Sequence, residues 1–101
     1  MDRNQLAAYE RMFPHDLITH IKTISDLDSL SGGEKQVIDI LRTLMQQRQV
    51  MIFDEPFSAL NAKVTDHFCQ NLKQISKDKI IIAIAHNDES LNAYFDHVIY
   101  L

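Results

Sequence analysis

The chain of 101 residues has little cysteine, little glycine and no long apolar or basic run, and each scarcity excludes a class of protein. Its single cysteine, Cys69, excludes an internal disulfide framework and suits a reducing compartment. No apolar run approaches the roughly 20 residues that span a bilayer. No basic segment followed by an apolar one comes after Met1, so we expect no secretion signal.

Positive charge is also scarce, because the formal net charge is −4 at pH 7 and the lysines and arginines form no block. We therefore expect no nucleic acid among the partners. What the chain does have is a hydrophobic fraction of 46%, which is enough for a core. Its length suits one small domain or a part of a larger one. The composition predicts a soluble intracellular protein.

The apolar residues predict helices that alternate with apolar strands. Helices are expected over residues 5–13, 17–24, 32–47, 62–76 and 87–95, the last with Asn87 or Asp88 as its cap. Strands are expected in VMIF at 50–53, KIIIAIAH at 79–86 and HVIYL at 97–101. Unbroken apolar strands between helices are typical of a parallel sheet that is buried on both faces. The predicted fold class is therefore α/β.

The two glycines of the chain, Gly32 and Gly33, stand together between Ser31 and Glu34. A serine followed three residues later by a glutamate is a capping-box pattern, so we expect Ser31 to be the N-cap of the helix that follows. Glycine is a poor helix former, but glycines in a first turn leave bare N–H groups that a phosphate can approach closely. A tight turn before a well-capped helix is the alternative interpretation.

Two adjacent carboxylates, Asp54 and Glu55, follow the strand VMIF. In open α/β sheets, ligands bind beyond the carboxyl ends of the strands. There Asp54 could hold Mg²⁺ directly or through water, and Glu55 could polarise an attacking water. A solvated acidic pair before Pro56 is the alternative.

His86 ends the strand at 79–86, and parallel strands would bring it to the same edge of the sheet. An imidazole at that edge can hydrogen-bond a phosphate oxygen, although a structural histidine fits the pattern as well. The remaining histidines share no metal-ligand spacing, and we interpret them as ordinary surface or core residues: His15, His20, His67 and His97.

Taken in order, these segments resemble the second half of an ATP-binding-cassette (ABC) ATPase domain. LSGGE at 30–34 resembles the signature motif, VMIFDEP at 50–56 the Walker B strand with its catalytic glutamate, SALN at 58–61 the D-loop, and His86 the switch histidine. The resemblance implies a partial P-loop NTPase fold, made of parallel strands with flanking helices. Residues 1–30 would belong to the helical subdomain, and residues 31–101 to the signature helix and the C-terminal part of the RecA-like core.

The same resemblance implies ATP and Mg²⁺ as cofactors. In this family the signature motif contacts ATP that is held by the partner subunit of a head-to-tail dimer. Asp54 would hold Mg²⁺, Glu55 would be the general base, and His86 would reach the γ-phosphate. The residues implied to lie at the nucleotide or along the dimer interface are Ser31, Gly32, Gly33, Glu34, Ser58 and Asn61.

The chain departs from the family pattern in several places. It contains no G-x-x-x-x-G-K-[ST] motif, so the Walker A loop that cradles the phosphates is missing and the chain alone should be inactive. It is then a fragment of a longer domain, or the product of a split or truncated gene. Glu34 replaces the usual Gln, Val37 and Asp39 the usual Arg and small residue of the signature helix, and Asn61 the usual Asp of the D-loop.

The missing loop has a structural consequence. In the family's sheet, the Walker A strand lies between the strand that ends at His86 and the strand that matches HVIYL. Without it, the segment KIIIAIA would present an unpaired apolar edge, and such edges invite pairing with another chain. We therefore predict that the chain self-associates or needs its missing half.

The motifs look most like those of a transporter motor, which hydrolyses ATP at the cytoplasmic face of the membrane. The partners would be a second ABC ATPase subunit, transmembrane permease domains and the missing Walker A half. Two alternatives remain open. One is an ABC ATPase of the chromosome-maintenance or DNA-repair type, and the other is a non-catalytic fragment that offers its signature helix in trans.

Overall fold

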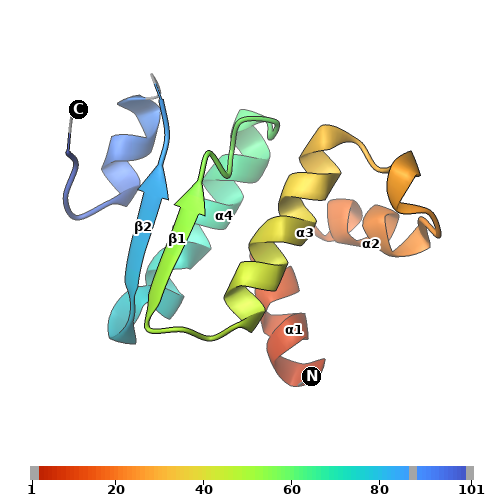
Figure 1. Cartoon of the computed structure of the whole chain (residues 1–101), viewed down its shortest axis with the longest axis horizontal. Helices are drawn as coiled ribbons and strands as arrows, with labels where there is room; N and C mark the ends of the chain where they lie inside the picture. The colour runs from red at the N-terminus through yellow and green to blue at the C-terminus, as the bar shows by residue number, and fades with distance from the viewer. Residues whose placement is uncertain (1–2, 87–88, 100–101) are drawn as a thin grey trace.

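The computed structural model describes residues 3–86 and 89–99. The elements are α1 (Arg3–Glu10), α2 (His15–Thr23), η1 (Leu27–Ser29), α3 (Gly32–Met45), β1 (Val50–Asp54), α4 (Ala62–Ile75), η2 (Ser76–Asp78), β2 (Ile80–Ile84) and η3 (Glu89–Tyr94), where η is a 3₁₀ helix. In Figure 1, α1 and α2 lie beside α3, and the two strands lie in front of α4. Within the described ranges, no helix combines the length and apolarity needed to cross a bilayer.

One core joins the helices to the sheet, and Phe68 of α4 is at its centre with no exposed surface. Its ring stacks on Phe13 with centroids 5.0 Å apart, and it contacts Phe53 of β1 and Phe57 of the following loop. Helix α3 buries the apolar stripe that its sequence predicts, and Val37 within it is fully buried. The N-terminal helices therefore share a core with the rest of the chain.

Strands β1 and β2 pair in parallel, with Val50 opposite Ile80 and Asp54 opposite Ile84. The predicted parallel α/β arrangement is confirmed, because α4 makes the crossover between the two strands. The expectation that both faces of the sheet are buried is wrong for this chain. Met51 and Phe53 are buried on one face, while these side chains on the other face are 40–60% exposed: Val50, Ile52, Ile80, Ile82 and Ile84.

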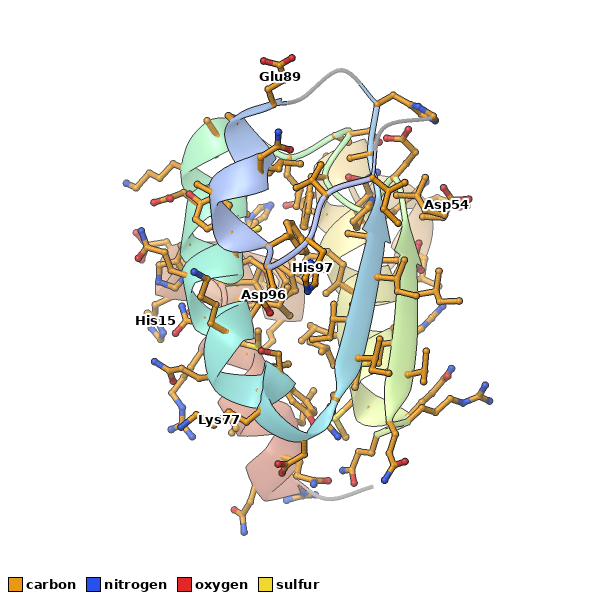
Figure 2. All side chains as sticks on the ribbon, turned by 90° about the vertical axis from the view of Figure 1, so that its left-hand side faces the viewer. His15, Asp54, Lys77, Glu89, Asp96 and His97 are labelled. Atoms are coloured by element: carbon orange, nitrogen blue, oxygen red, sulfur yellow. The ribbon has the colours of Figure 1, made fainter. Side chains whose placement is uncertain are left out.

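We call this second face, formed by Val50, Ile52, Ile80, Ile82 and Ile84, the open face. Helix α4 lies on the opposite side of the sheet: it is behind the strands in Figure 1 and to one side of them in the view turned by 90° (Figure 2). No element of the described ranges packs across the open face, which therefore exposes isoleucine and valine side chains to solvent.

The predicted third strand, HVIYL, is wrong for the residues that the structure describes. Residues 97–99 have no strand structure, and Tyr100 and Leu101 lie outside the described residues. The described part of the sheet has two strands. The strand that lies between β2 and this segment in the family's sheet is therefore not available in the described residues to hydrogen-bond with HVI at 97–99. The predicted helix over 87–95 is a 3₁₀ helix over Glu89–Tyr94, and its expected caps, Asn87 and Asp88, lie outside the described residues.

Candidate functional site

The start of α3 has the predicted capping box. Ser31 is the N-cap, and its hydroxyl oxygen accepts a hydrogen bond from the Glu34 backbone N–H at 3.1 Å. The Ser31 backbone N–H in turn donates to Glu34 Oε1 at 2.8 Å. Gly32 and Gly33 form the first turn of the helix, as the sequence predicts. The box therefore holds the glycine N–H groups in place at the positive end of the helix dipole.

Glu34 also connects this helix start to the N-terminal helices. Its Oε2 lies 2.9 Å from Nε2 of His20, which is exposed on α2. The hydrogen bond from the Ser31 backbone holds the pKa of Glu34 below its ordinary value, against the opposing effect of burial, and the Ser31 hydroxyl and His20 add to the lowering. Glu34 is therefore ionised at neutral pH, and its carboxylate accepts the hydrogen bond from the Ser31 N–H at the helix start.

The two glycines have different surroundings. A Cβ placed on Gly33 would lie 2.8 Å from the carbonyl oxygen of Ala59, which is closer than such contacts occur. A Cβ placed on Gly32 would meet the Ala59 Cβ at an ordinary 3.7 Å. Gly33 is therefore required by the packing of α3 against the loop 55–61, whereas Gly32 is not.

The end of β1 brings the acidic pair and His86 to one edge of the sheet, as parallel strands predict. Asp54 is exposed, and Figure 2 shows it projecting away from the core. Glu55 Oε1 lies 3.1 Å from Nε2 of His86. The Glu55 backbone has φ 49°, a left-handed conformation that is uncommon for residues with a side chain. Its N–H donates to the Ile84 carbonyl at 2.8 Å, which ties the turn to β2.

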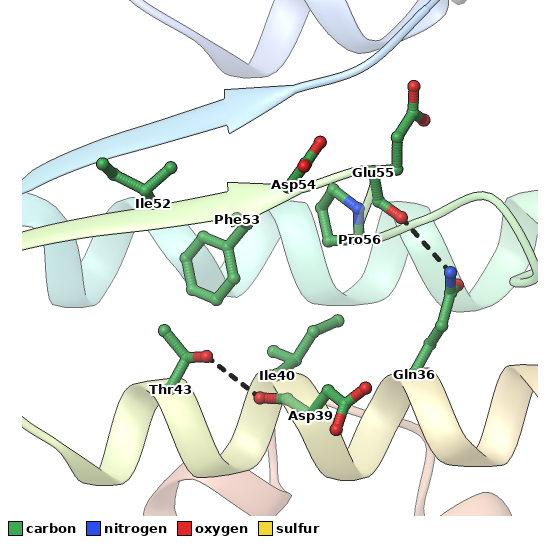
Figure 3. Close-up of a pocket in the computed structure, with 9 residues that line it drawn as sticks. All are labelled: Gln36, Asp39, Ile40, Thr43, Ile52, Phe53, Asp54, Glu55 and Pro56. Atoms are coloured by element: carbon green, nitrogen blue, oxygen red, sulfur yellow. Dashed lines mark hydrogen bonds between the residues drawn. The ribbon is translucent and has the colours of Figure 1, made fainter.

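One residue that sequence reasoning missed, Gln36, joins α3 to this loop. Its Nε2 lies 3.2 Å from the Glu55 carbonyl and 2.6 Å from Ser58 Oγ, and its Oε1 accepts from the Ala59 N–H at 2.9 Å. Figure 3 shows the Glu55 carbonyl facing Gln36 while the Glu55 carboxylate points away from α3. The spacing of Gln36 three residues after Gly33 was the available signal, because residues three apart share a helix face.

The two residues expected in a D-loop, Ser58 and Asn61, are placed differently. Ser58 lies beside α3 through its bond to Gln36, whereas Asn61 is the N-cap of α4 and its Oδ1 accepts from the Val64 N–H at 2.9 Å. The structure thus joins the glycines to Ser58 and Ala59 through α3, and joins Glu55 to His86 through the sheet. The unusual Asp39 of α3 is exposed.

A shallow pocket of about 140 Å³ lies between α3 and the end of β1, with Asp39 and Asp54 on its two sides (Figure 3). It is smaller than the 300–1,000 Å³ typical of pockets that enclose a small-molecule ligand. Across residues 3–86 and 89–99, no three histidine, cysteine or acidic side chains gather in a way that could hold a metal. Asp54 fits a Mg²⁺ that takes its other ligands from water and phosphate oxygens, as that ion commonly does.

Comparisons with known proteins agree on one family. A family model described as ABC transporter matches residues 2–58. The thiamine import ATP-binding protein ThiQ of Haemophilus ducreyi is 34% identical over 76 residues, which are 73% of this chain and 36% of that protein. ABC transporter B family member 26 of Arabidopsis thaliana is 34% identical over 96 residues, 87% of this chain and 14% of that protein. A solved bacterial Atm1-family ABC exporter with ATP bound has a TM-score of 0.72 at 25% identity, covering 89% of this chain and 17% of that one.

Proposed function

Because this chain belongs to the ABC transporter family and spans only part of the length of the relatives compared above, we propose that it is the signature-bearing half of an ATP-hydrolysing transporter domain. The observation that carries the proposal is the loop 55–61, which lies against the glycine turn of α3 on one side and against His86 on the other. Residues 1–30 would be part of the helical subdomain, and residues 31–101 part of the core.

Each candidate residue has a role in this proposal. Ser31, Gly32 and Gly33 would bind the phosphates of ATP held by a partner subunit, since the capping box presents the N–H groups of the first turn. Asp54 would hold Mg²⁺, which when bound neutralises charge on the phosphates. Glu55 would accept a proton from the attacking water. His86, 3.1 Å from the Glu55 carboxylate, would orient that carboxylate and reach the γ-phosphate.

The remaining residues would act at the interface between subunits. Ser58 lies exposed beside α3, where a partner's nucleotide can approach it. Asn61 would hold the end of the loop by capping α4, so the loss of a charge relative to the family's Asp leaves its capping function intact. Glu34 would support the signature turn through the capping box.

The proposed partners are a second ATPase subunit in a head-to-tail dimer, transmembrane permease domains and a Walker A half that completes the nucleotide site. ATP hydrolysis would take place at the cytoplasmic face of a membrane. The relatives compared above are named as import or transporter proteins, which favours this interpretation over a chromosome-maintenance ATPase.

Phosphate release tests the proposal. We expect no ATP turnover from the chain alone, and turnover when it is combined with the Walker A half of an ABC ATPase domain. Glu55→Gln should lower the combined rate by at least about 100-fold, because general-base catalysis contributes factors of this size. Glu89→Gln, which changes an exposed glutamate on η3, is the matched control. Turnover by the chain alone, or turnover that survives Glu55→Gln, would refute the proposal.

A second candidate is a non-catalytic chain that offers its signature helix to a complete ATPase, since this chain forms the capped glycine turn of α3 by itself. Such a chain would change the ATPase rate of the complete enzyme through Ser31 and the glycines, and Glu55→Gln would leave that effect unchanged. The same pair of proteins therefore distinguishes the two functions.

A further inference from the structure

The loop 55–61 is hydrogen-bonded to α3 by the side chain of Gln36, which uses both its amide nitrogen and its amide oxygen. The Gln36 amide donates to the Glu55 carbonyl and to Ser58 Oγ, and its oxygen accepts from the Ala59 N–H. Gln36 is half-buried, and its bond to the Glu55 carbonyl is partly shielded from water, whereas its bonds to Ser58 and Ala59 are exposed. A single residue of α3 is thus hydrogen-bonded to three residues of the loop.

The bond to Glu55 matters because the Glu55 backbone is in the left-handed region, at φ 49°. A residue with a side chain stays in this conformation only where its surroundings hold it there. The Ile84 carbonyl holds the Glu55 N–H from the side of the sheet, and Gln36 holds the Glu55 carbonyl from the side of α3. Ser58 Oγ also donates to the Glu55 carbonyl, at a longer 3.4 Å, and Gln36 holds that hydroxyl as well.

The second contact between α3 and the loop lies one turn earlier, at Gly33. A Cβ there would lie 2.8 Å from the Ala59 carbonyl oxygen, so the helix and the loop are already at closest approach. Gln36 accepts a bond from the N–H of the same residue, Ala59. Because the loop is fixed at two successive turns of one helix, the start of α3 cannot shift without moving the loop.

We propose that Gln36 is a positioning residue that couples the glycine turn of α3 to the backbone of Glu55. It acts through the loop 55–61, which its three hydrogen bonds contact. Its significance for ATP hydrolysis rests on the proposed function, but the coupling itself is a property of this chain and is measurable without nucleotide.

Two substitutions separate the donor from the acceptor of Gln36. Gln36→Glu keeps an acceptor for the Ala59 N–H and removes the donor to the Glu55 carbonyl. Gln36→Met has a similar length and removes both. Gln74→Glu, on the exposed side of α4, is the matched control. If Gln36 only stabilised the fold, both variants would disturb all signals of the loop together.

The measurement is NMR on the isotopically labelled full chain at neutral pH. In Gln36→Glu, we expect the Glu55 carbonyl ¹³C resonance to shift while the Ala59 amide exchanges within about twofold of the wild-type rate. In Gln36→Met, we expect the same carbonyl shift and about fivefold faster exchange at Ala59, as the loss of one hydrogen bond predicts. In both variants the Gly32 and Gly33 amide resonances should shift, and in Gln74→Glu none of these signals should.

An unchanged Glu55 carbonyl in Gln36→Glu, or unmoved Gly32 and Gly33 amides, would overturn the proposal. If Gln36→Met does not fold, the split between donor and acceptor signals in Gln36→Glu decides alone. These signals need no nucleotide, so a failed ATPase experiment refutes the proposed function and leaves the coupling standing. Retained Glu55-dependent hydrolysis with no NMR change refutes only the coupling.

Discussion

The two faces of the β1–β2 sheet carry similar apolar side chains in opposite surroundings. Met51 and Phe53 are 2% and 5% exposed, whereas Ile52 between them is 59% exposed. A strand that is meant to be solvated on one face usually alternates apolar with polar residues, and these strands do not. The open face therefore has the composition of a buried surface, and we expect a further layer of protein to cover it in the complete assembly.

The largest effect should come from the covered face. Phe68→Ala removes the central ring of the core, and we expect the free energy of unfolding to fall by about 3–5 kcal/mol, a large part of the roughly 5–15 kcal/mol of an ordinary domain. Ile52→Ala on the open face should cost less than about 1 kcal/mol, because that side chain already meets water. Denaturant unfolding followed by circular dichroism gives both values, and equal losses would contradict the comparison.

An intermediate effect should appear where the start of α3 meets the loop 55–61. We expect Gly33→Ala to lower the free energy of unfolding by about 1–3 kcal/mol, because the new Cβ collides with the Ala59 carbonyl. In Gly32→Ala the new Cβ makes only an ordinary van der Waals contact with the Ala59 Cβ and improves helix propensity, so the change should be neutral or raise stability by up to about 1 kcal/mol. Thermal unfolding of the two variants side by side measures the difference, and a more stable Gly33→Ala would show that the contact is not rigid.

The open face should affect association more than stability. We expect the wild-type chain to self-associate, since the apolar face and the unpaired edge of β2 are available to other chains within the described structure. Ile52→Lys combined with Ile82→Lys should reduce association and change unfolding by no more than about 1 kcal/mol. Light scattering over a concentration series is the measurement. A stable, monodisperse wild-type monomer would count against the prediction.

The smallest effect concerns the capping box at the start of α3. The pKa of Glu34 is lowered in the folded chain, so its ionised form contributes stability above the ordinary carboxyl pKa of about 4.3. That contribution is lost as the pH falls through the lowered pKa. We expect Glu34→Gln to show a shallower loss of stability across this acid range than the wild type or the control Glu89→Gln. Parallel stability curves for all three would exclude the effect.

Much of the site was predictable because its signals are local. The spacing of Ser31 and Glu34 predicted the capping box, and the abrupt end of VMIF predicted where the carboxylates lie. The expectation that parallel strands bring His86 to Glu55 was also right, since it follows from strand direction alone. The functional roles of these residues remain predictions until the ATPase experiment is done.

By itself, the sequence determined most of the elements, the parallel pairing of β1 and β2 and the residues at the strand ends, because hydrophobic periodicity and caps act over a few residues. Only the tertiary structure decided that Gly33 has no room for a side chain, that Gln36 holds the Glu55 loop, and that one sheet face stays open. It also left residues 97–99 without strand structure. These features depend on which surfaces of segments far apart in the sequence come into contact. The pattern within one strand or helix does not specify which segment will pack against it.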